Sequence, residues 1–232
     1  MTNKELLDLY EGLRSADVVD GLQAFGHINI GSVDQDIKPL WRDVETYKHR
    51  ICGFAFTVRF LPTNKVDHSN TIEEHEKNSR HFFNTFANHH PDLEAINDEN
   101  ILIFDCGNIF DWGGFGTLGA LLLMKKGVRG MITNNSTRDS DEIIRLKFPL
   151  YCKKIGRGHR NFRSEYDACN VRINLGETLV CPGDMIVADG DGVVVVPIDL
   201  VEKVGKYARG ILESDDEFII QQGLTNEAAN LM

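Results

Sequence analysis

The chain has 232 residues, and its 35 acidic against 25 basic side chains give a formal net charge of −10. Hydrophobic residues make up 42% and charged residues 26%, which is the composition of a globular protein and not of a disordered or coiled-coil chain. An acidic chain lacks the basic surface that nucleic acids and anionic membranes require, and no apolar run approaches the ~18 residues of a membrane span, so neither partner is expected.

The N-terminal region predicts two helices. Residues 4–13 are amphipathic and lack the apolar stretch and small-residue cleavage site of a signal peptide. Residues 15–25 carry apolar side chains at helical spacing, with Ser15 as a capping hydroxyl and Gly26 just past the end. The five cysteines of the chain are widely spaced and none forms a CxxC pair, which favours reduced thiols and a cytoplasmic location.

The middle of the chain alternates strand and helix patterns. Residues 51–61 and 101–104 are apolar runs typical of buried strands. Between them, the polar residues near 67–100 predict a helical insertion. Residues 107–116 are dense in glycine, and an apolar helix over residues 117–126 follows directly.

The second half of the chain predicts a strand at residues 130–133 and a helix at 139–146. Short strands and turns follow over residues 148–197, and a long helix follows over 198–222. Strands that alternate with helices, followed by a strand-rich block, favour a single mixed α/β domain.

Two segments of the same form, strand then loop then helix start, carry the most informative pattern. In the first, Gly113, Gly114 and Gly116 leave no side chain between the backbone N–H groups and a ligand, and the positive end of the helix at Thr117 attracts anions. A glycine loop before a helix is more often only a tight turn. Its pairing with the second segment is what favours an anion site.

The second segment ends in Arg138 and Asp139. A guanidinium fork suits a carboxylate or enolate oxygen, and an aspartate beside it can hold a divalent cation. Alone, such a pair is more often a helix-end charge and a surface ion pair. Together, the two segments predict an anion site next to a cation site.

Four stretches resemble the RraA-like family, which includes 4-hydroxy-4-methyl-2-oxoglutarate aldolases and the regulator of ribonuclease activity A. They are the helix SADVVDGLQAFG at 15–26, the strand RICGFAFTVRF at 50–60, the run GTLGALLLMKKGVRGMITNNSTRD at 116–139, and LGETLVCPGDMIVADGDGVVVVP at 175–197. The last stretch is long and quite specific. The resemblance covers nearly the whole chain apart from the insertion near 67–100.

The resemblance implies the fold and the assembly. The family fold is a β/β/α sandwich of the swivelling-domain type, so residues 1–232 are expected to form one such domain with the insertion near 67–100 and the C-terminal helix near 198–222. Family members assemble as trimers or hexamers with active sites between subunits, which implies a homo-oligomer.

The resemblance also implies roles for individual residues. Arg138 would contact the keto or enolate oxygen of the substrate, and Asp139 would bind Mg²⁺ or Mn²⁺. Glu217, with Glu213 as the fallback, would reach the metal's waters from a neighbouring subunit, although a solvated helix face explains either glutamate equally well. The substrate-binding positions that the resemblance implies would be Gly114, Phe115, Gly116, Thr117, Leu118, Gly119 and Arg138. Apart from the resemblance, His159 lies in a basic stretch of a strand-rich region that could reach a second substrate carboxylate, and a surface loop that balances local acids explains it equally well.

One departure from the family concerns the catalytic base. Family aldolases carry a carboxylate where this chain has Thr117, which leaves the base for retro-aldol cleavage in doubt. The resemblance implies a metal-dependent lyase that forms a pyruvate enolate from a small 2-oxo acid, by aldol cleavage or by decarboxylation. No motif places a lysine for a Schiff base, which favours the metal route. A non-catalytic protein-binding regulator, or a dehydratase or isomerase on the same scaffold, remains an alternative.

Overall fold

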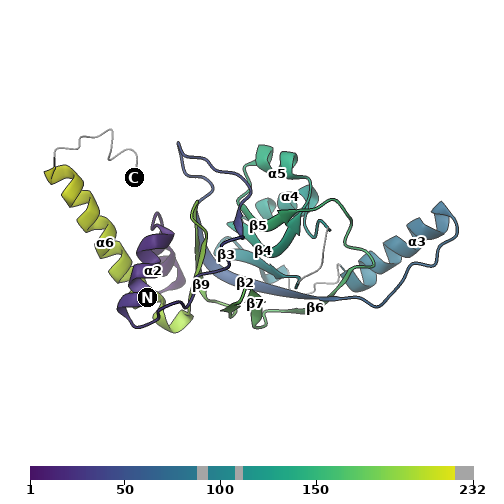
Figure 1. The fold of residues 1–232 in the computed structure, drawn as a ribbon, viewed down its shortest axis with the longest axis horizontal. Coiled ribbons are helices and arrows are strands. Elements are labelled where there is room, and N and C mark those ends of the chain that lie inside the picture. Colours follow the sequence, from purple (N-terminus) through teal and green to yellow (C-terminus); the bar gives the residue numbers. More distant parts are fainter. Residues whose placement is uncertain (88–93, 108–111, 223–232) are drawn as a thin grey trace.

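The computed structural model describes residues 1–87, 94–107 and 112–222, and Figure 1 shows the mixed α/β fold that the sequence predicts. The six α-helices of these residues are α1 (Asn3–Tyr10), α2 (Ser15–Ala24), α3 (Ile72–Phe82), α4 (Thr117–Lys125), α5 (Ser140–Leu146) and α6 (Val201–Gln221). Their strands are β1 (Lys38–Pro39), β2 (Ile51–Pro62), β3 (Asn100–Asp105), β4 (Gly130–Thr137), β5 (Leu150–Ile155), β6 (Ser164–Cys169), β7 (Ile173–Leu175), β8 (Thr178–Val180), β9 (Met185–Ala188) and β10 (Val193–Val196).

The main sheet runs in the order β1-β5-β4-β3-β2-β9-β10, and β6 pairs with the far end of β2. Strands β2, β3, β4 and β5 are parallel neighbours, whereas β9, β10, β1 and β6 join antiparallel. Because β3 and β4 are parallel, their carboxyl ends meet at the same edge of the sheet. That edge is where the sequence predicts the functional site.

Two groups of helices cover different parts of the sheet. Helices α4 and α5 lie together over β4 and β5 (Figure 1), and a core that includes Phe104, Phe115, Ile143 and Phe148 lies beneath them. Helices α1, α2 and α6 pack against one another near β9, where Tyr10 donates a hydrogen bond to the carbonyl of Val201 at 2.8 Å. Figure 1 shows α3 and α6 extending from opposite ends of the molecule.

The local predictions need three corrections. Ser15 does not cap its helix: the N-cap is Arg14, and the Ser15 hydroxyl donates to Asp189 at 2.9 Å. Asp139 is the N-cap of α5 and not its first residue. Strand β4 continues to Thr137, four residues beyond the predicted end, because its polar end is held by hydrogen bonds to neighbouring segments.

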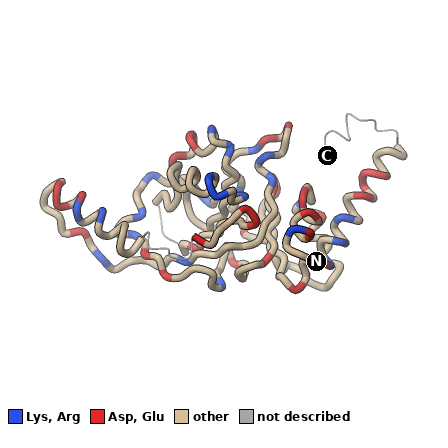
Figure 2. Tube along the Cα trace, turned by 180° about the vertical axis from the view of Figure 1, so that it is seen from behind, with Lys and Arg blue, Asp and Glu red and all other residues tan. Residues whose placement is uncertain are grey.

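Within the described residues, no helix is both long enough and apolar enough to span a membrane. Helix α6 is the longest at 21 residues, and charged side chains recur along it (Figure 2).

Candidate functional site

The glycine loop and the end of β4 lie side by side, as the sequence predicts. The backbone N–H of Arg138 donates to the Phe115 carbonyl at 2.9 Å, and the Thr137 hydroxyl donates to the same oxygen at 3.0 Å. The N–H of Gly114 reaches the carbonyl of Ser136 at 3.1 Å. These bonds fix the start of α4 against Arg138 and Asp139.

The space beside two of the loop glycines is filled by the chain itself and not left for a ligand. A Cβ at Gly113 would lie 2.4 Å from Cβ of Arg138, and one at Gly116 would lie 2.4 Å from Oδ2 of Asp139. Gly113 and Gly116 are therefore needed to admit the Arg138 and Asp139 side chains. This packing is a further role of the two glycines, and the access of a ligand to the loop N–H groups stays a prediction.

Asp139 joins the two segments through its side chain. Its backbone is left-handed, with φ 56° and ψ 40°, a conformation that Asp and Asn tolerate better than most residues. Its Oδ2 accepts the backbone N–H of Thr117 at 3.0 Å, so Asp139 caps α4 from another part of the chain. The side-chain cap that the N-cap residue Gly116 cannot provide thus comes from Asp139.

Arg138 and Asp139 form a loose ion pair at the surface. The Arg138 Nε lies 3.5 Å from the Asp139 Oδ1, and each side chain is 37% exposed. An exposed pair of this kind contributes at most about 1 kcal/mol to stability. Both charged groups therefore remain accessible to a ligand.

The start of α4 presents free donors beside this pair. Thr117 is the first helical residue and not a cap, and its N–H is taken by Asp139. The next two N–H groups, of Leu118 and Gly119, have no acceptor inside an α-helix, and we find none for them elsewhere in the described residues. The Thr117 hydroxyl is buried and has no hydrogen-bond partner among the described atoms.

His159 lies within electrostatic reach of Arg138. The carbonyl of Gly158, one residue earlier, accepts the N–H of Gly113 at 2.8 Å, which brings this segment beside the loop. Partial burial and the positive charge of Arg138 lower the pKa of His159, so its imidazole is neutral near pH 7. Its Nδ1 accepts the N–H of Asn161 at 3.2 Å, which leaves the proton of the neutral ring on Nε2.

A divalent cation would find one carboxylate here. The described residues contain no group of three or more His, Cys, Asp or Glu side chains that could enclose a metal. Asp139 nevertheless fits the mode in which Mg²⁺ keeps several waters and takes only one or two carboxylates besides substrate oxygens. The residues therefore fit an open cation site completed by water and substrate.

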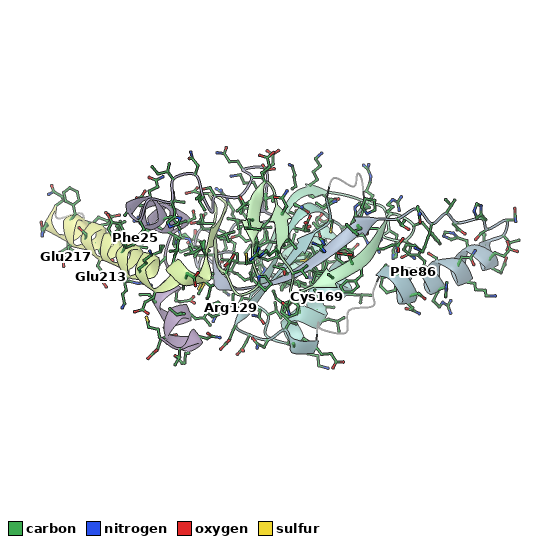
Figure 3. All side chains as sticks on the ribbon, turned by 90° about the horizontal axis from the view of Figure 1, so that it is seen from below. Phe25, Phe86, Arg129, Cys169, Glu213 and Glu217 are labelled. Carbon is green, nitrogen blue, oxygen red and sulfur yellow. The ribbon has the colours of Figure 1, made fainter. Side chains whose placement is uncertain are left out.

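Glu213 and Glu217 do not join this site within one chain. Both lie on the part of α6 that extends away from the sheet (Figure 3), whereas α4 and α5 lie over the middle of the sheet (Figure 1). A role for either glutamate therefore requires a second subunit.

Trp112 and Ser136 position the loop, and the sequence reasoning did not single them out. The Trp112 ring is fully buried, and a Cβ at Gly114 would lie 2.9 Å from it. The Ser136 hydroxyl donates to the Trp112 carbonyl. An aromatic residue directly before two glycines was the available signal for this packing.

The fold and the site together define an α/β protein in which a helix start with two free N–H groups lies beside an Arg-Asp pair. Residues 15–195 match the RraA-like family, described as Aldolase/RraA, and the chain belongs to that family. The family contains both aldolases and non-catalytic regulators.

Among curated proteins, the chain is 27% identical to protein DlpA of Legionella pneumophila over 205 residues, covering 88% of this chain and 29% of DlpA. It is 33% identical over 99 residues to a putative 4-hydroxy-4-methyl-2-oxoglutarate aldolase of Halalkalibacterium halodurans, covering 39% of this chain and 42% of that protein. The matched part is thus less than half of either relative.

Solved structures share the fold. RraAS2 of Streptomyces coelicolor, described as an unusual member of the RNase ES inhibitor RraA protein family, superposes with a TM-score of 0.74 at 22% identity and covers 94% of this chain and 98% of that one. An uncharacterized protein from Pseudomonas syringae gives the same TM-score at 24% identity, with 98% of this chain and 93% of that one covered.

Proposed function

We propose that this chain is a lyase that converts a small 2-oxo acid to a pyruvate enolate, by retro-aldol cleavage of a 4-hydroxy-2-oxo acid or by decarboxylation of oxaloacetate. The observation that carries the proposal is the position of Arg138 and Asp139 beside the free N–H groups of Leu118 and Gly119. The aldolase name of a partial relative supports the same reaction class.

In the proposed reaction, different groups of the chain bind different parts of the substrate. The N–H groups of Leu118 and Gly119 would bind the substrate carboxylate at the positive end of α4. Arg138 would donate to the 2-oxo oxygen and stabilise the negative charge that develops there, and one such preorganised donor is typically worth roughly 3 kcal/mol in the transition state. Asp139, with waters and substrate oxygens, would hold a Mg²⁺ or Mn²⁺ ion, whose chemistry there is Lewis-acid polarisation of the 2-oxo group.

His159 would bind the far end of the substrate. Its neutral ring offers an Nε2–H donor near Arg138, which suits the second carboxylate of a dicarboxylic 2-oxo acid. His159 is a positioning residue in this scheme and takes no proton from the reacting atoms.

The test is pyruvate release from oxaloacetate in the presence of Mg²⁺, coupled to lactate dehydrogenase. Asp139→Asn keeps an oxygen that can accept the Thr117 N–H but removes the carboxylate charge, so turnover should fall at least 100-fold while the fold is kept. Glu142→Gln, an exposed carboxylate in the first turn of α5, is the matched control and should keep full activity. Absence of pyruvate from the wild-type protein with every 2-oxo acid tried would favour the non-catalytic regulator.

A further inference from the structure

Arg160 is a charged side chain that forms no ion pair with any residue that the structure describes. Its Nη1 donates to the Ala87 carbonyl at 2.9 Å, and its guanidinium lies 4.8 Å from the centre of the Phe60 ring. Its Nε is enclosed and has no hydrogen-bond partner among the described atoms. Burial lowers the pKa of Arg160 to about 10, so the group is still charged at neutral pH.

Arg160 is one of the residues that line a pocket of about 660 Å³. That volume lies in the range of small-molecule sites, roughly 300–1,000 Å³. The walls are mostly apolar and come from β3, the glycine loop and α4. The main apolar lining residues are Ile96, Leu102, Phe104, Phe115, Leu122 and Leu123.

The charges around the pocket are mainly positive. Lys125 and Lys126 line it at the end of α4, and Glu94 is the one acidic residue among its described lining residues. Arg160 therefore places a positive charge at a mostly apolar wall. A carboxylate in the pocket beside Arg160 would be attracted by this charge and can form charge-assisted hydrogen bonds with accessible guanidinium N–H groups.

We propose that this pocket binds an organic monocarboxylate with an apolar body, of the size of a medium-chain fatty acid. The carboxylate lies against Arg160, and the apolar body lies along the wall formed by Phe104, Leu122 and Leu123. The mostly apolar wall favours a ligand with an apolar body over a compact phosphate ester, although Lys125 and Lys126 also line the pocket.

The pocket is distinct from the site of the proposed lyase reaction. Arg138 and Asp139 are not among its described lining residues, although Phe115 of the loop and Gly119 of α4 border both sites. The binding proposed here therefore does not depend on the lyase activity.

The experiment titrates decanoate, below its micelle concentration, into the intact wild-type protein by calorimetry, with decanol as the uncharged probe. We expect saturable decanoate binding at least tenfold tighter than decanol binding, and a rise in Tm with decanoate concentration by mass action. Arg160→Met keeps an apolar stem and should weaken decanoate at least tenfold, without weakening decanol. Arg145→Met, which removes an exposed arginine from α5, is the charge-matched control and should bind as wild type.

A second variant keeps the proposal testable if Arg160→Met does not fold. Leu122 lines the pocket and is 66% exposed, so Leu122→Asp can fold while placing a negative charge at the wall, and it should weaken decanoate. Equal affinities for decanoate and decanol would overturn the proposal, as would full decanoate affinity in Arg160→Met or in Leu122→Asp. Displacement of decanoate by pyruvate would assign it to the glycine-loop site and would also overturn the proposal.

Discussion

At the scale of single residues, Gly116 and Asp139 depend on each other. The Asp139 carboxylate occupies the volume that a side chain at position 116 would need, and it caps α4 from there. The sequence predicts that Gly116 leaves space for a ligand. In the structure, the Asp139 side chain occupies the space beside Gly116.

Gly116→Ala should displace Asp139. The new Cβ would lie 2.4 Å from Oδ2, so the carboxylate must move and the cap on Thr117 is lost. We expect a loss of stability on the order of 1–3 kcal/mol, typical of overpacking, together with loss of lyase activity. Denaturant unfolding measures the first and the coupled pyruvate assay the second.

The control for this substitution is Gly210→Ala in α6, where a Cβ would meet nothing within 4 Å. Alanine favours helix over glycine, so this variant should be as stable as wild type or slightly more stable. An equal loss of stability in both variants would contradict the account of Gly116.

Under the proposed function, we expect Thr117 to decide which of the two lyase reactions is faster. Retro-aldol cleavage needs a base for the C4 hydroxyl, a contribution typically worth about 10²–10⁴-fold, whereas decarboxylation needs none. The wild-type protein should therefore decarboxylate oxaloacetate faster than it cleaves 4-hydroxy-4-methyl-2-oxoglutarate. Thr117→Asp should raise the cleavage rate and leave decarboxylation nearly unchanged. Wild-type cleavage as fast as decarboxylation would place the base elsewhere, and Asp141 would then be the next residue to substitute.

At the scale of elements, α6 extends away from the sheet of its own chain (Figure 1). Lys203, Lys206 and Arg209 lie on its inner half and Glu213 and Glu217 on its outer half, a change of charge that Figure 2 shows along the helix. Near its outer end, Phe218 and Ile220 are 59% and 71% exposed. Acidic and apolar side chains on a projecting helix suit contact with a second copy of the chain.

A subunit-mixing experiment tests whether Glu217 serves a neighbour. Glu217→Gln and Asp139→Asn should each be nearly inactive alone, because each lacks one half of a shared site. Mixed after reversible dissociation, the two variants should regain part of the wild-type activity, since some interfaces then combine an intact Asp139 with an intact Glu217. If Glu217→Gln is as active as the wild-type protein, Glu217 has no role in the shared site. Glu213 would then be tested in the same experiment.

At the scale of the whole molecule, the two projecting helices give an extended outline (Figure 1), and the exposed apolar end of α6 lacks a cover within the described chain. We expect a homo-oligomer, most simply a trimer or a pair of trimers. Light scattering at micromolar concentration should give three or six times the 26.1 kDa of one chain. A mass of one chain would contradict this expectation and the shared site with it.

The same scale shows which parts of the fold the sequence could predict. The start of α4 is where the sequence predicts it, and β9 and β10 lie in the region predicted to hold short strands, because a glycine followed by a helical pattern and apolar runs decide them. Strand β6 lies in the same region, but no local pattern defines its bounds. It has four partly buried residues and one exposed one, and it is a strand because it pairs with the long β2, as in Tyr166 opposite Phe60.

Some features of the candidate site could be predicted from the sequence, and others could not. The residue types of Arg138 and Asp139 and their place after a strand could be read from the sequence, because chemistry and order along the chain suffice for that. The contact of Asp139 with Thr117 could not be read, because it joins segments 22 residues apart and depends on a left-handed backbone at Asp139.

If Asp139 holds a metal as proposed, its cap on α4 is a second role, and the two roles together bear on how this family can evolve. A descendant that lost its reaction would still gain from the cap on α4, so selection for folding alone would retain the aspartate. Apart from its loose pair with Asp139, the Arg138 side chain makes no hydrogen bond or ion pair within the described residues, so nothing comparable would retain it. Drift at the arginine, and not at the aspartate, should therefore mark the relatives that have ceased to be enzymes.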